Sequence, residues 1–327
     1  VGRLVDRVPI RRMLLGGSAY AMLSLFLISR APTLPLAAVG LFSYAIGFVF
    51  YGPLVVNALM VKLYPGRQGS ALAIVAIGIS VSSITLPPIV GAALQWLDWR
   101  TTLATMSIVM LALLWGWILA AVPAGAGVTV DNSRPRVSGD IYRQSAFWLV
   151  GIPLALALNV TVILTICYPP LFGQRGYSAV EAGLFLSAGG IGGIFGKLAV
   201  AGIADAFRLR ARGLAAALLS IKLFGLTLLL NTQSTPLVVA AVAIMGCSGG
   251  ALLPIHAYLN SRYFEAEIIG QVNGAQGPLF LPLALIGAPL AGYVFDRTGS
   301  YDLVLTGLIG IQMTAVVIVL LLPRPRH

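Results

Sequence analysis

The stretch VGRLVDRVPIRR, residues 1–12, places a glycine, an aspartate and four arginines directly before an apolar run. A weaker copy follows at Asp205, which precedes Arg208, Arg210 and Arg212, and the two aspartates are 205 − 6 = 199 residues apart. A second landmark has nearly the same offset, because the prolines of PPIVG and APLAG differ by 289 − 88 = 201 positions. Two unrelated landmarks with one offset indicate a duplicated unit.

The composition indicates a protein embedded in a membrane. Hydrophobic residues make up 58% of the 327 residues and charged residues only 9%, whereas soluble chains carry about a quarter charged residues. The net charge of +11 does not indicate nucleic-acid binding, because the basic residues lie between apolar stretches rather than on one soluble face. Cys167 and Cys247 fall inside apolar stretches, where we expect them to be small packing residues.

Apolar stretches of about 20 residues, each long enough to cross a bilayer, recur along the chain. Breaks at charges, prolines and glycines predict ten spans: 13–29, 35–61, 69–95, 101–122, 145–168, 179–201, 212–230, 236–260, 268–292 and 302–322. The expected fold is an all-α membrane protein. The polar segment 123–144 is expected to be a central loop between residues 1–122, with four spans, and residues 145–327, with six.

The basic residues predict the orientation. Four arginines lie on one side, Lys197 and Lys222 lie inside spans, and the remaining 21 − 4 − 2 = 15 lie on the other side; the four are Arg30, Arg100, Arg175 and Arg297. The side with more basic residues is cytoplasmic by the positive-inside rule. Both ends of this chain and the central loop are therefore expected in the cytoplasm, with the protein in the cell membrane, as in a bacterial inner membrane.

Parallel repeats joined by a cytoplasmic loop are typical of transporters with two six-helix halves. Since the first half here has four spans, the pattern predicts two further spans ahead of residue 1.

The opening stretch also resembles a known loop signature, that of the major facilitator superfamily between its helices two and three. Four further segments make the chain similar to the monocarboxylate and oxalate/formate porter branch: WLDWR (96–100), GYSAVEAG (176–183), YLNSRYF (258–264) and GAPLAGYVFDRTGSY (287–301). The resemblance covers the whole chain as family helices three to twelve of twelve, and it implies a transporter that works by alternating access. The chain departs from several members at GALLPIHAYL, where they carry an acid.

The charged loops are candidates for a conformational latch. Asp6 can accept charge-assisted hydrogen bonds from arginines and lie at the positive end of the next helix. Such a cluster would hold the cytoplasmic side closed and break when the halves rock apart. The alternative is that these residues are ordinary positive-inside anchors. The proposed latch residues are Gly2, Asp6, Arg7, Arg11, Arg12, Asp205, Arg208 and Arg210.

Lys197 is the main candidate for substrate binding. All ten acids fall in loops or at span ends, whereas Lys197, Lys222 and His256 lie deep in spans, where ionisable groups are costly and mark function. A bound anion would supply the missing counter-charge. Lys197 follows GGIGGIFG and precedes Asp205 by eight residues, about 12 Å along a helix. Monocarboxylate-type porters carry arginine there, which implies a contact with a substrate carboxylate. The alternative is a lysine that extends to the cytoplasmic face.

Other polar residues are expected to complete the site. His256 follows Pro254 and could carry a proton in symport; the alternative is a hydrogen-bonded histidine between helices. Asn159 and Tyr168 are further candidates, although anchoring at the membrane interface explains Tyr168 equally well. For Lys222 we favour a contact between helices, or a side chain that extends along the helix to the membrane surface.

Helix-breaking residues mark the third and ninth spans as bendable, and the family resemblance implies a gating role for these helices. The residues are Gly78, Pro88, Gly277, Pro278 and Pro289.

The sequence contains no P-loop, no Ser-His-Asp arrangement and no metal-ligand spacing among its two His and two Cys, so we expect no enzymatic activity, cofactor or metal. It favours a monomeric secondary transporter for a small organic anion such as a monocarboxylate, coupled to a proton or to anion exchange. Efflux of amphipathic compounds is the alternative within the class. A non-transporting receptor, a scaffold or an inactive relic is the alternative from another class.

Overall fold

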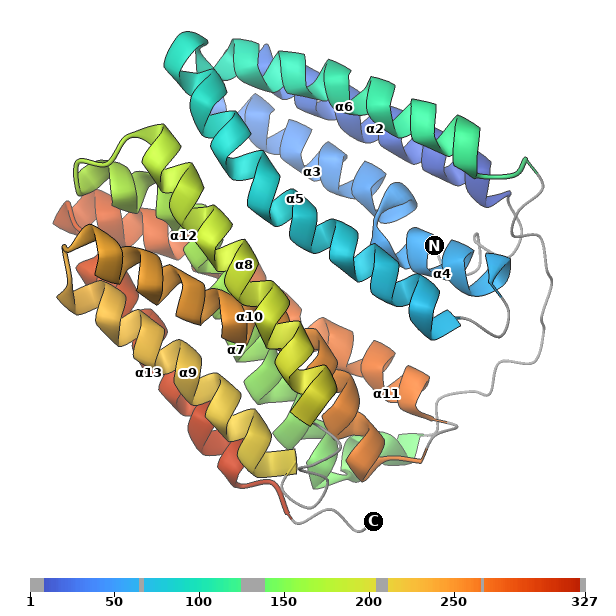
Figure 1. Ribbon diagram of the computed structural model, residues 1–327, viewed down its shortest axis with the longest axis vertical. Helices are drawn as coiled ribbons and strands as arrows, with labels where there is room; N and C mark the ends of the chain where they lie inside the picture. The colour runs from blue at the N-terminus through green and yellow to red at the C-terminus, as the bar shows by residue number, and fades with distance from the viewer. Residues whose placement is uncertain (1–8, 65–67, 125–138, 204–210, 266–267, 324–327) are drawn as a thin grey trace. The chain divides into compact units, whose positions relative to one another are not determined.

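A computed structural model describes residues 9–64, 68–124, 139–203, 211–265 and 268–323. The described residues form helices and contain no strand (Figure 1). The elements are α2 (Ile10–Ser29), α3 (Leu34–Tyr51), α4 (Pro53–Leu63), α5 (Gln68–Trp96), α6 (Trp99–Ala121), the 3-10 helix η1 (Gly139–Arg143), α7 (Ser145–Gln174), α8 (Ala179–Ile203), α9 (Ala211–Asn231), α10 (Thr235–Tyr263), α11 (Ile269–Gln276), the 3-10 helix η3 (Gly277–Phe280), α12 (Leu281–Thr298) and α13 (Asp302–Leu320).

Ten helical stretches among these residues are long and apolar enough to cross a membrane. The predicted all-α membrane fold is therefore confirmed. Two stretches are interrupted: Leu34–Met60 contains α3 and most of α4, and Gln271–Thr298 contains most of α11 together with η3 and α12.

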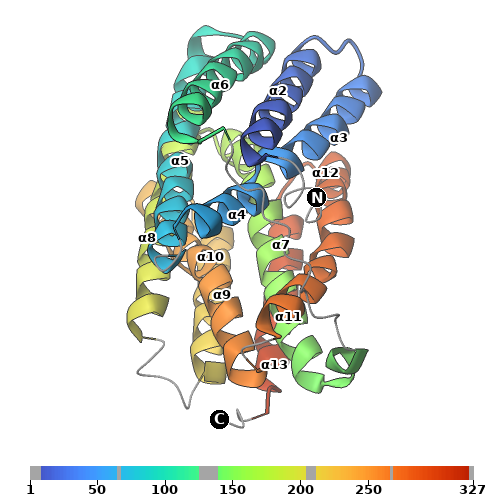
Figure 2. The same ribbon diagram turned by 90° about the vertical axis from the view of Figure 1, so that its right-hand side faces the viewer.

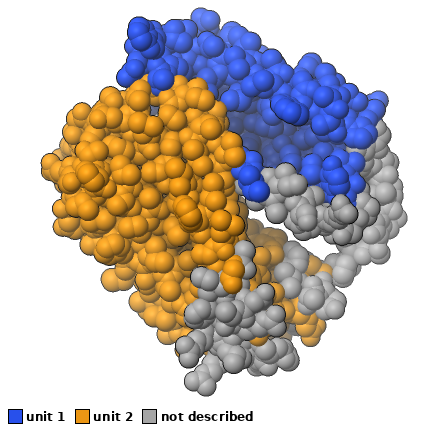
Figure 3. Space-filling model, in the orientation of Figure 1, with its two compact units in different colours: residues 1–79, 92–135 blue, residues 80–91, 136–327 orange. Residues whose placement is uncertain are grey.

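The chain divides into two compact units (Figure 3). Unit 1 comprises residues 1–79 and 92–135, and unit 2 comprises residues 80–91 and 136–327. The middle of α5 thus belongs to unit 2. Within unit 1, α2 lies beside α3 and α6; within unit 2, α9 lies beside α10 and α13, and α8 beside α10 (Figures 1 and 2).

Each unit contains a matching contact between the start of one helix and the end of another. In unit 1, Arg11 Nη2 at the start of α2 donates to the Leu119 carbonyl near the end of α6, at 3.2 Å. In unit 2, Arg212 Nη1 at the start of α9 donates to the carbonyls of Leu320 and Leu322 at the end of α13. The offsets agree, since 212 − 11 = 201 and 320 − 119 = 201. An arginine that satisfies carbonyls left open at a helix end therefore recurs with the repeat predicted from the sequence.

Helix α7 continues past the expected end of its span. The sequence placed that end at 168, before Pro169 and Pro170, but α7 runs to Gln174. Both prolines are exposed, while Leu171 and Phe172 beyond them are buried in the core. Burial of these side chains keeps the helix intact, although each proline removes one backbone hydrogen bond.

Two prolines coincide with real interruptions. Pro53 has no N–H and begins the new helix α4, and the carbonyl of the preceding Gly52 accepts from the N–H groups of Val55 and Val56. Gly277 and Pro278 start the 3-10 segment η3. The other proposed gating residues sit in continuous helices, which are α5 for Gly78 and Pro88 and α12 for Pro289. The gating role stays a prediction.

Glycines let α8 approach α10 through the backbone. A β-carbon on Gly192 or Gly196 of α8 would overlap the carbonyl oxygens of Ala243 and Cys247 on α10. Such backbone contact is typical of packed membrane helices, where small residues replace the hydrophobic drive of water. The glycine-rich sequence before Lys197 thus lets the backbone of α8 lie directly against that of α10.

A second glycine face of α8 packs on residues 80–91 of α5. A β-carbon on Gly183 would lie 2.6 Å from the Pro87 carbonyl oxygen, and one on Gly190 would lie 2.8 Å from the Ile84 side chain. Ser187 Oγ lies between these glycines along α8 and donates to the Ile84 carbonyl at 2.6 Å. This contact holds α5 beside the residues that precede Lys197.

Candidate functional site

Lys197 lies on α8, half-buried, one residue after the glycine that touches α10. Its Nζ donates to Ser80 Oγ on α5 at 2.5 Å, and Ser80 itself is 4% exposed. Glu181, the acid at the start of the same helix, is 197 − 181 = 16 residues away, about 24 Å along the axis. The ammonium therefore has a hydroxyl neighbour, and the acid of its own helix is out of reach. Its predicted contact with substrate stays a prediction.

His256 belongs to a network of amide side chains between α10 and α11. Its Nε2 lies 2.7 Å from Gln276 Oε1. Asn260 Nδ2 donates to Gln276 Oε1 at 2.7 Å and to Asn273 Oδ1 at 2.5 Å. The histidine thus makes the hydrogen bonds between helices that the sequence left open as an alternative, and its role as a proton carrier stays a prediction.

The network also assigns the tautomer of His256. Gln276 Nε2 donates to the Phe147 carbonyl on α7 at 2.8 Å, which leaves Oε1 as the amide atom that faces the histidine. An amide oxygen only accepts, so His256 Nε2 carries the hydrogen and Nδ1 is the nitrogen where a second proton would bind. Asn260 Oδ1 is buried without a partner among the described residues, which leaves one acceptor open to water or another donor.

Asn159 is 2% exposed on α7 and faces the interruption in the ninth span. Its Nδ2 donates to the Ala155 carbonyl and, at 3.0 Å, to the Phe280 carbonyl at the end of η3. Both hydrogens of the amide are therefore committed to backbone. The structure gives Asn159 a means of holding η3 against α7, and its predicted contact with substrate is untested.

Tyr168 lies in the core of unit 2 and is 7% exposed. Its ring stacks on Phe172 with centroids 5.3 Å apart, and its hydroxyl donates to Met245 Sδ at 3.8 Å. These contacts come from packing, and the substrate role predicted for Tyr168 rests on the sequence alone.

Lys222 makes the contact between helices that the sequence favoured. It is 1% exposed on α9, and its Nζ donates to the Ala157 carbonyl on α7 at 2.9 Å and to Thr161 Oγ1 at 2.5 Å. Helices α7, α9, α10 and α13 contain one acid among their described residues, Asp302 at the first position of α13. Among the described residues of these helices, the Lys222 ammonium is therefore stabilised by the dipoles of a carbonyl and a hydroxyl.

Most of the proposed latch lies outside the described residues, namely Gly2, Asp6, Arg7, Asp205, Arg208 and Arg210. Two of its members are described. Arg11 makes the helix-end contact to Leu119, and Arg12 is exposed on the next position of α2. The latch stays a prediction.

Sequence reasoning missed Ser80 and Asn260 as partners of Lys197 and His256. A signal existed for Ser80, because ISVSSIT (79–85) places four hydroxyls in a span. Asn260 stands one turn after His256, the spacing at which helical side chains meet. The sequence could have pointed to both.

Comparison with known proteins places the chain among transporters. It is 26% identical over 321 residues to "Monocarboxylate transporter 13" of Rattus norvegicus, covering 91% of this chain and 70% of that protein. It is 24% identical over 176 residues to "Uncharacterized transporter YycB" of Bacillus subtilis (strain 168), covering 54% and 44%.

Solved structures show the same fold. A bacterial homolog of the human lysosomal transporter Spinster, in an inward-facing and unoccupied conformation, has a TM-score of 0.68 at 12% identity, covering 97% of this chain and 81% of that one. Its inward-facing and occupied form has a TM-score of 0.63 at 14% identity, with the same coverage. The family model of the Major Facilitator Superfamily matches residues 1–281. The family expected from the opening stretch is thereby confirmed, and the chain belongs to the Major Facilitator Superfamily.

Proposed function

We propose that this multi-pass transporter moves a small organic anion, such as a monocarboxylate, by alternating access, together with a proton or in exchange for another anion. The observation that carries the proposal is Lys197, a half-buried ammonium in a span whose only described acid lies at its far end. Its Nζ donates to the Ser80 hydroxyl, so a cation and a hydroxyl lie side by side on α8 and α5, and a carboxylate there would accept a charge-assisted hydrogen bond from the ammonium. The relative named as a monocarboxylate transporter supports this substrate class.

His256 supplies the proposed proton step. Nε2 is held by Gln276, so a proton would bind at Nδ1 and give an imidazolium that donates from both nitrogens. Protonation would add a positive charge to unit 2 and favour entry of the anion; release of the proton on the other side would favour its exit. We place the protein as a monomer in the cell membrane with both ends of this chain in the cytoplasm. Residues 1–122 and 145–327 would form its two halves, joined by 123–144.

Uptake by the purified full-length chain in proteoliposomes tests the substrate class. Labelled lactate, pyruvate and oxalate are the probes. Lys197→Met should lower uptake roughly thirtyfold or more, since loss of a charged partner costs about 2 kcal/mol or more. Lys197→Arg, which keeps the charge, should retain a substantial part. Gel filtration and thermal unfolding would establish that both variants fold.

Coupling is tested by the pH dependence of the same uptake. Under symport, wild-type uptake should rise as the external pH falls, and His256→Gln should flatten this dependence while the protein stays folded. Under exchange, uptake should instead require an anion inside the vesicles.

Uptake that is unchanged in Lys197→Met would contradict the anion proposal. Resistance to amphipathic compounds on expression, equal in wild type and Lys197→Met, would indicate efflux. A protein with neither activity would fit a receptor, a scaffold or an inactive relic.

A further inference from the structure

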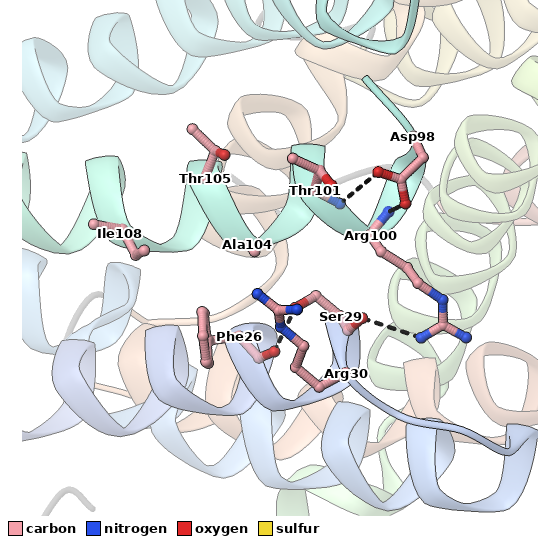
Figure 4. Close-up of a pocket in the computed structure, with 9 residues that line it drawn as sticks. All are labelled: Phe26, Ser29, Arg30, Asp98, Arg100, Thr101, Ala104, Thr105 and Ile108. Carbon is pink, nitrogen blue, oxygen red and sulfur yellow. Dashed lines mark hydrogen bonds between the residues drawn. The ribbon is translucent and has the colours of Figure 1, made fainter.

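Unit 1 contains a cavity of about 490 Å³ between the end of α2 and the start of α6 (Figure 4). Small-molecule sites have volumes of about 300–1,000 Å³. Two oppositely charged residues, Arg30 and Asp98, line the cavity together with Arg100, while Phe26 and Ile108 supply its apolar lining. The proposed transport site uses none of these residues.

Arg100 and Asp98 form a fixed wall of the cavity. Arg100 Nη1 donates to the carbonyls of Ser29 and Ala31 at 3.0 and 2.8 Å and so ties α6 to the end of α2. The Asp98 carboxylate caps α6 by accepting from the N–H groups of Arg100 and Thr101. Its hydrogen bonding to Thr101 lowers the pKa of the Asp98 carboxyl, so Asp98 carries a negative charge at neutral pH.

Arg30 is the cation that this wall leaves available. Its guanidinium lies over the Phe26 ring, 5.5 Å from the centroid. In the part of the chain that the structure describes, the Arg30 side chain makes no hydrogen bond, and no ion pair joins it to Asp98. A positive and a negative charge therefore line one cavity without neutralising each other.

The surroundings place this cavity at a membrane–water boundary. Trp96 and Trp99, which flank Asp98, are 86% and 51% exposed, and exposed tryptophans at span ends are typical of that boundary. Phe26 lies one turn before Arg30 on α2. Ile108 follows Trp99 by nine residues, about 14 Å along α6. The cavity is thus charged near the boundary and apolar toward the bilayer interior.

We propose that this cavity binds the headgroup of a zwitterionic phospholipid with a primary amine, of the phosphatidylethanolamine type. Arg30 contacts its phosphate and Asp98 its ammonium group, so the headgroup bridges the two unpaired charges. The first part of an acyl chain follows Phe26 and Ile108. The charge pattern and the apolar inner end together favour a lipid over a soluble anion.

Native mass spectrometry of the purified full-length chain tests this site by titration with phosphatidylethanolamine, phosphatidylcholine and phosphatidylglycerol. Phosphatidylethanolamine should bind most tightly, because its ammonium group can donate hydrogen bonds to Asp98. Arg30→Gln should weaken its binding about tenfold, the usual effect of losing a hydrogen bond to a charged group. Arg297→Gln is the matched control, since Arg297 lies over the Tyr293 ring at 5.2 Å in the other unit, and it should change binding less than twofold.

A second variant keeps every charge. Ile108 is 60% exposed, so Ile108→Trp should be accommodated while it fills the inner end of the cavity, and it should weaken lipid binding severalfold. If Arg30→Gln does not fold, this variant decides the question.

Four results would overturn the proposal. One is an equal effect of Arg30→Gln and Arg297→Gln, and a second is no effect of Ile108→Trp. The third is equal binding of the three phospholipids. The fourth is binding of inorganic phosphate or glycerophosphoethanolamine as tight as that of the lipid, which would assign the cavity to a soluble phosphate.

Discussion

Helices α2 and α9 stand at equivalent places in the repeat, but they use their middle positions differently. The offset of 201 that relates Arg11 to Arg212 pairs Lys222 with position 222 − 201 = 21, which is an alanine. Ala21 is fully buried, and its backbone lies close to Gly47 on α3. A β-carbon added to Gly47 would lie only 2.7 Å from the Ala21 nitrogen. Lys222 instead donates to α7. The repeat thus keeps its helix-end contacts and differs in the middle, where one copy packs by small residues and the other by a buried cation.

The largest effect is expected when the middle of α2 is made to resemble that of α9. Ala21→Lys should lower the free energy of unfolding by about 4 kcal/mol or more, because the close approach of α3 leaves no room for a long side chain and the charge would be buried. Denaturant titration in micelles measures this loss. Ala21→Ser, which is small and polar, is the control and should cost about 1 kcal/mol or less. Similar stabilities of the two variants would show that α2 tolerates a cation as α9 does.

Reversal of the charge on α9 should have the next largest effect. In Lys222→Glu a carboxylate would face the Ala157 carbonyl, and an uncompensated buried charge costs about 3–5 kcal/mol. The same titration measures the loss. Lys222→Gln can still donate to α7 and should lose less than half as much, so equal losses would argue against a role for the sign of the charge.

The helix-end contacts should give smaller and matched effects. Arg11→Gln and Arg212→Gln each remove a charge-assisted bond to carbonyls at a helix end, and each should cost about 1 kcal/mol. Thermal unfolding of the two variants side by side measures the match. A loss in only one of them would show that the two copies of the contact are not equivalent.

The smallest effect is expected when the cation of α9 is replaced by an apolar side chain of similar size. Lys222→Met should change the free energy of unfolding by about 1 kcal/mol or less in either direction, since such replacements of buried ions are often neutral. Uptake should stay within about threefold of wild type, in contrast to Lys197→Met. Loss of uptake in a folded Lys222→Met protein would bring Lys222 into the transport mechanism.

The fold could be predicted from local features of the sequence. Long apolar runs between charges specify spans, because the bilayer requires them. The interruption at Gly277–Pro278 could also be predicted locally, because glycine and proline break helices. The passage of α7 through Pro169 and Pro170 was not, because it depends on the burial of Leu171 and Phe172 in a core formed by distant helices.

The site could be predicted only in part. Lys197 and His256 stand out because ionisable groups are rare in spans. Their partners depend on contacts between helices, such as Lys197 with Ser80, 117 positions away. The bond from Asn159 to Phe280 joins residues 121 positions apart, and no spacing rule along the chain predicts it. Residue type therefore identifies the candidates, while their partners follow from helix packing.

The two glycine faces of α8 have a mechanical consequence. Helices usually lock together because side-chain ridges of one fit into grooves of the other, which resists sliding along the axis. Where Gly192 and Gly196 meet α10 and Gly183 and Gly190 meet α5, α8 has no ridges to interlock. At these positions α8 resists axial sliding less by interlocked side chains than by hydrogen bonds, such as that from Ser187 to the Ile84 carbonyl. An axial shift of α8, which would carry the Lys197 charge with it, would therefore have to break the bonds of Ser187 and Lys197 to α5, but no side-chain interlock at the four glycines.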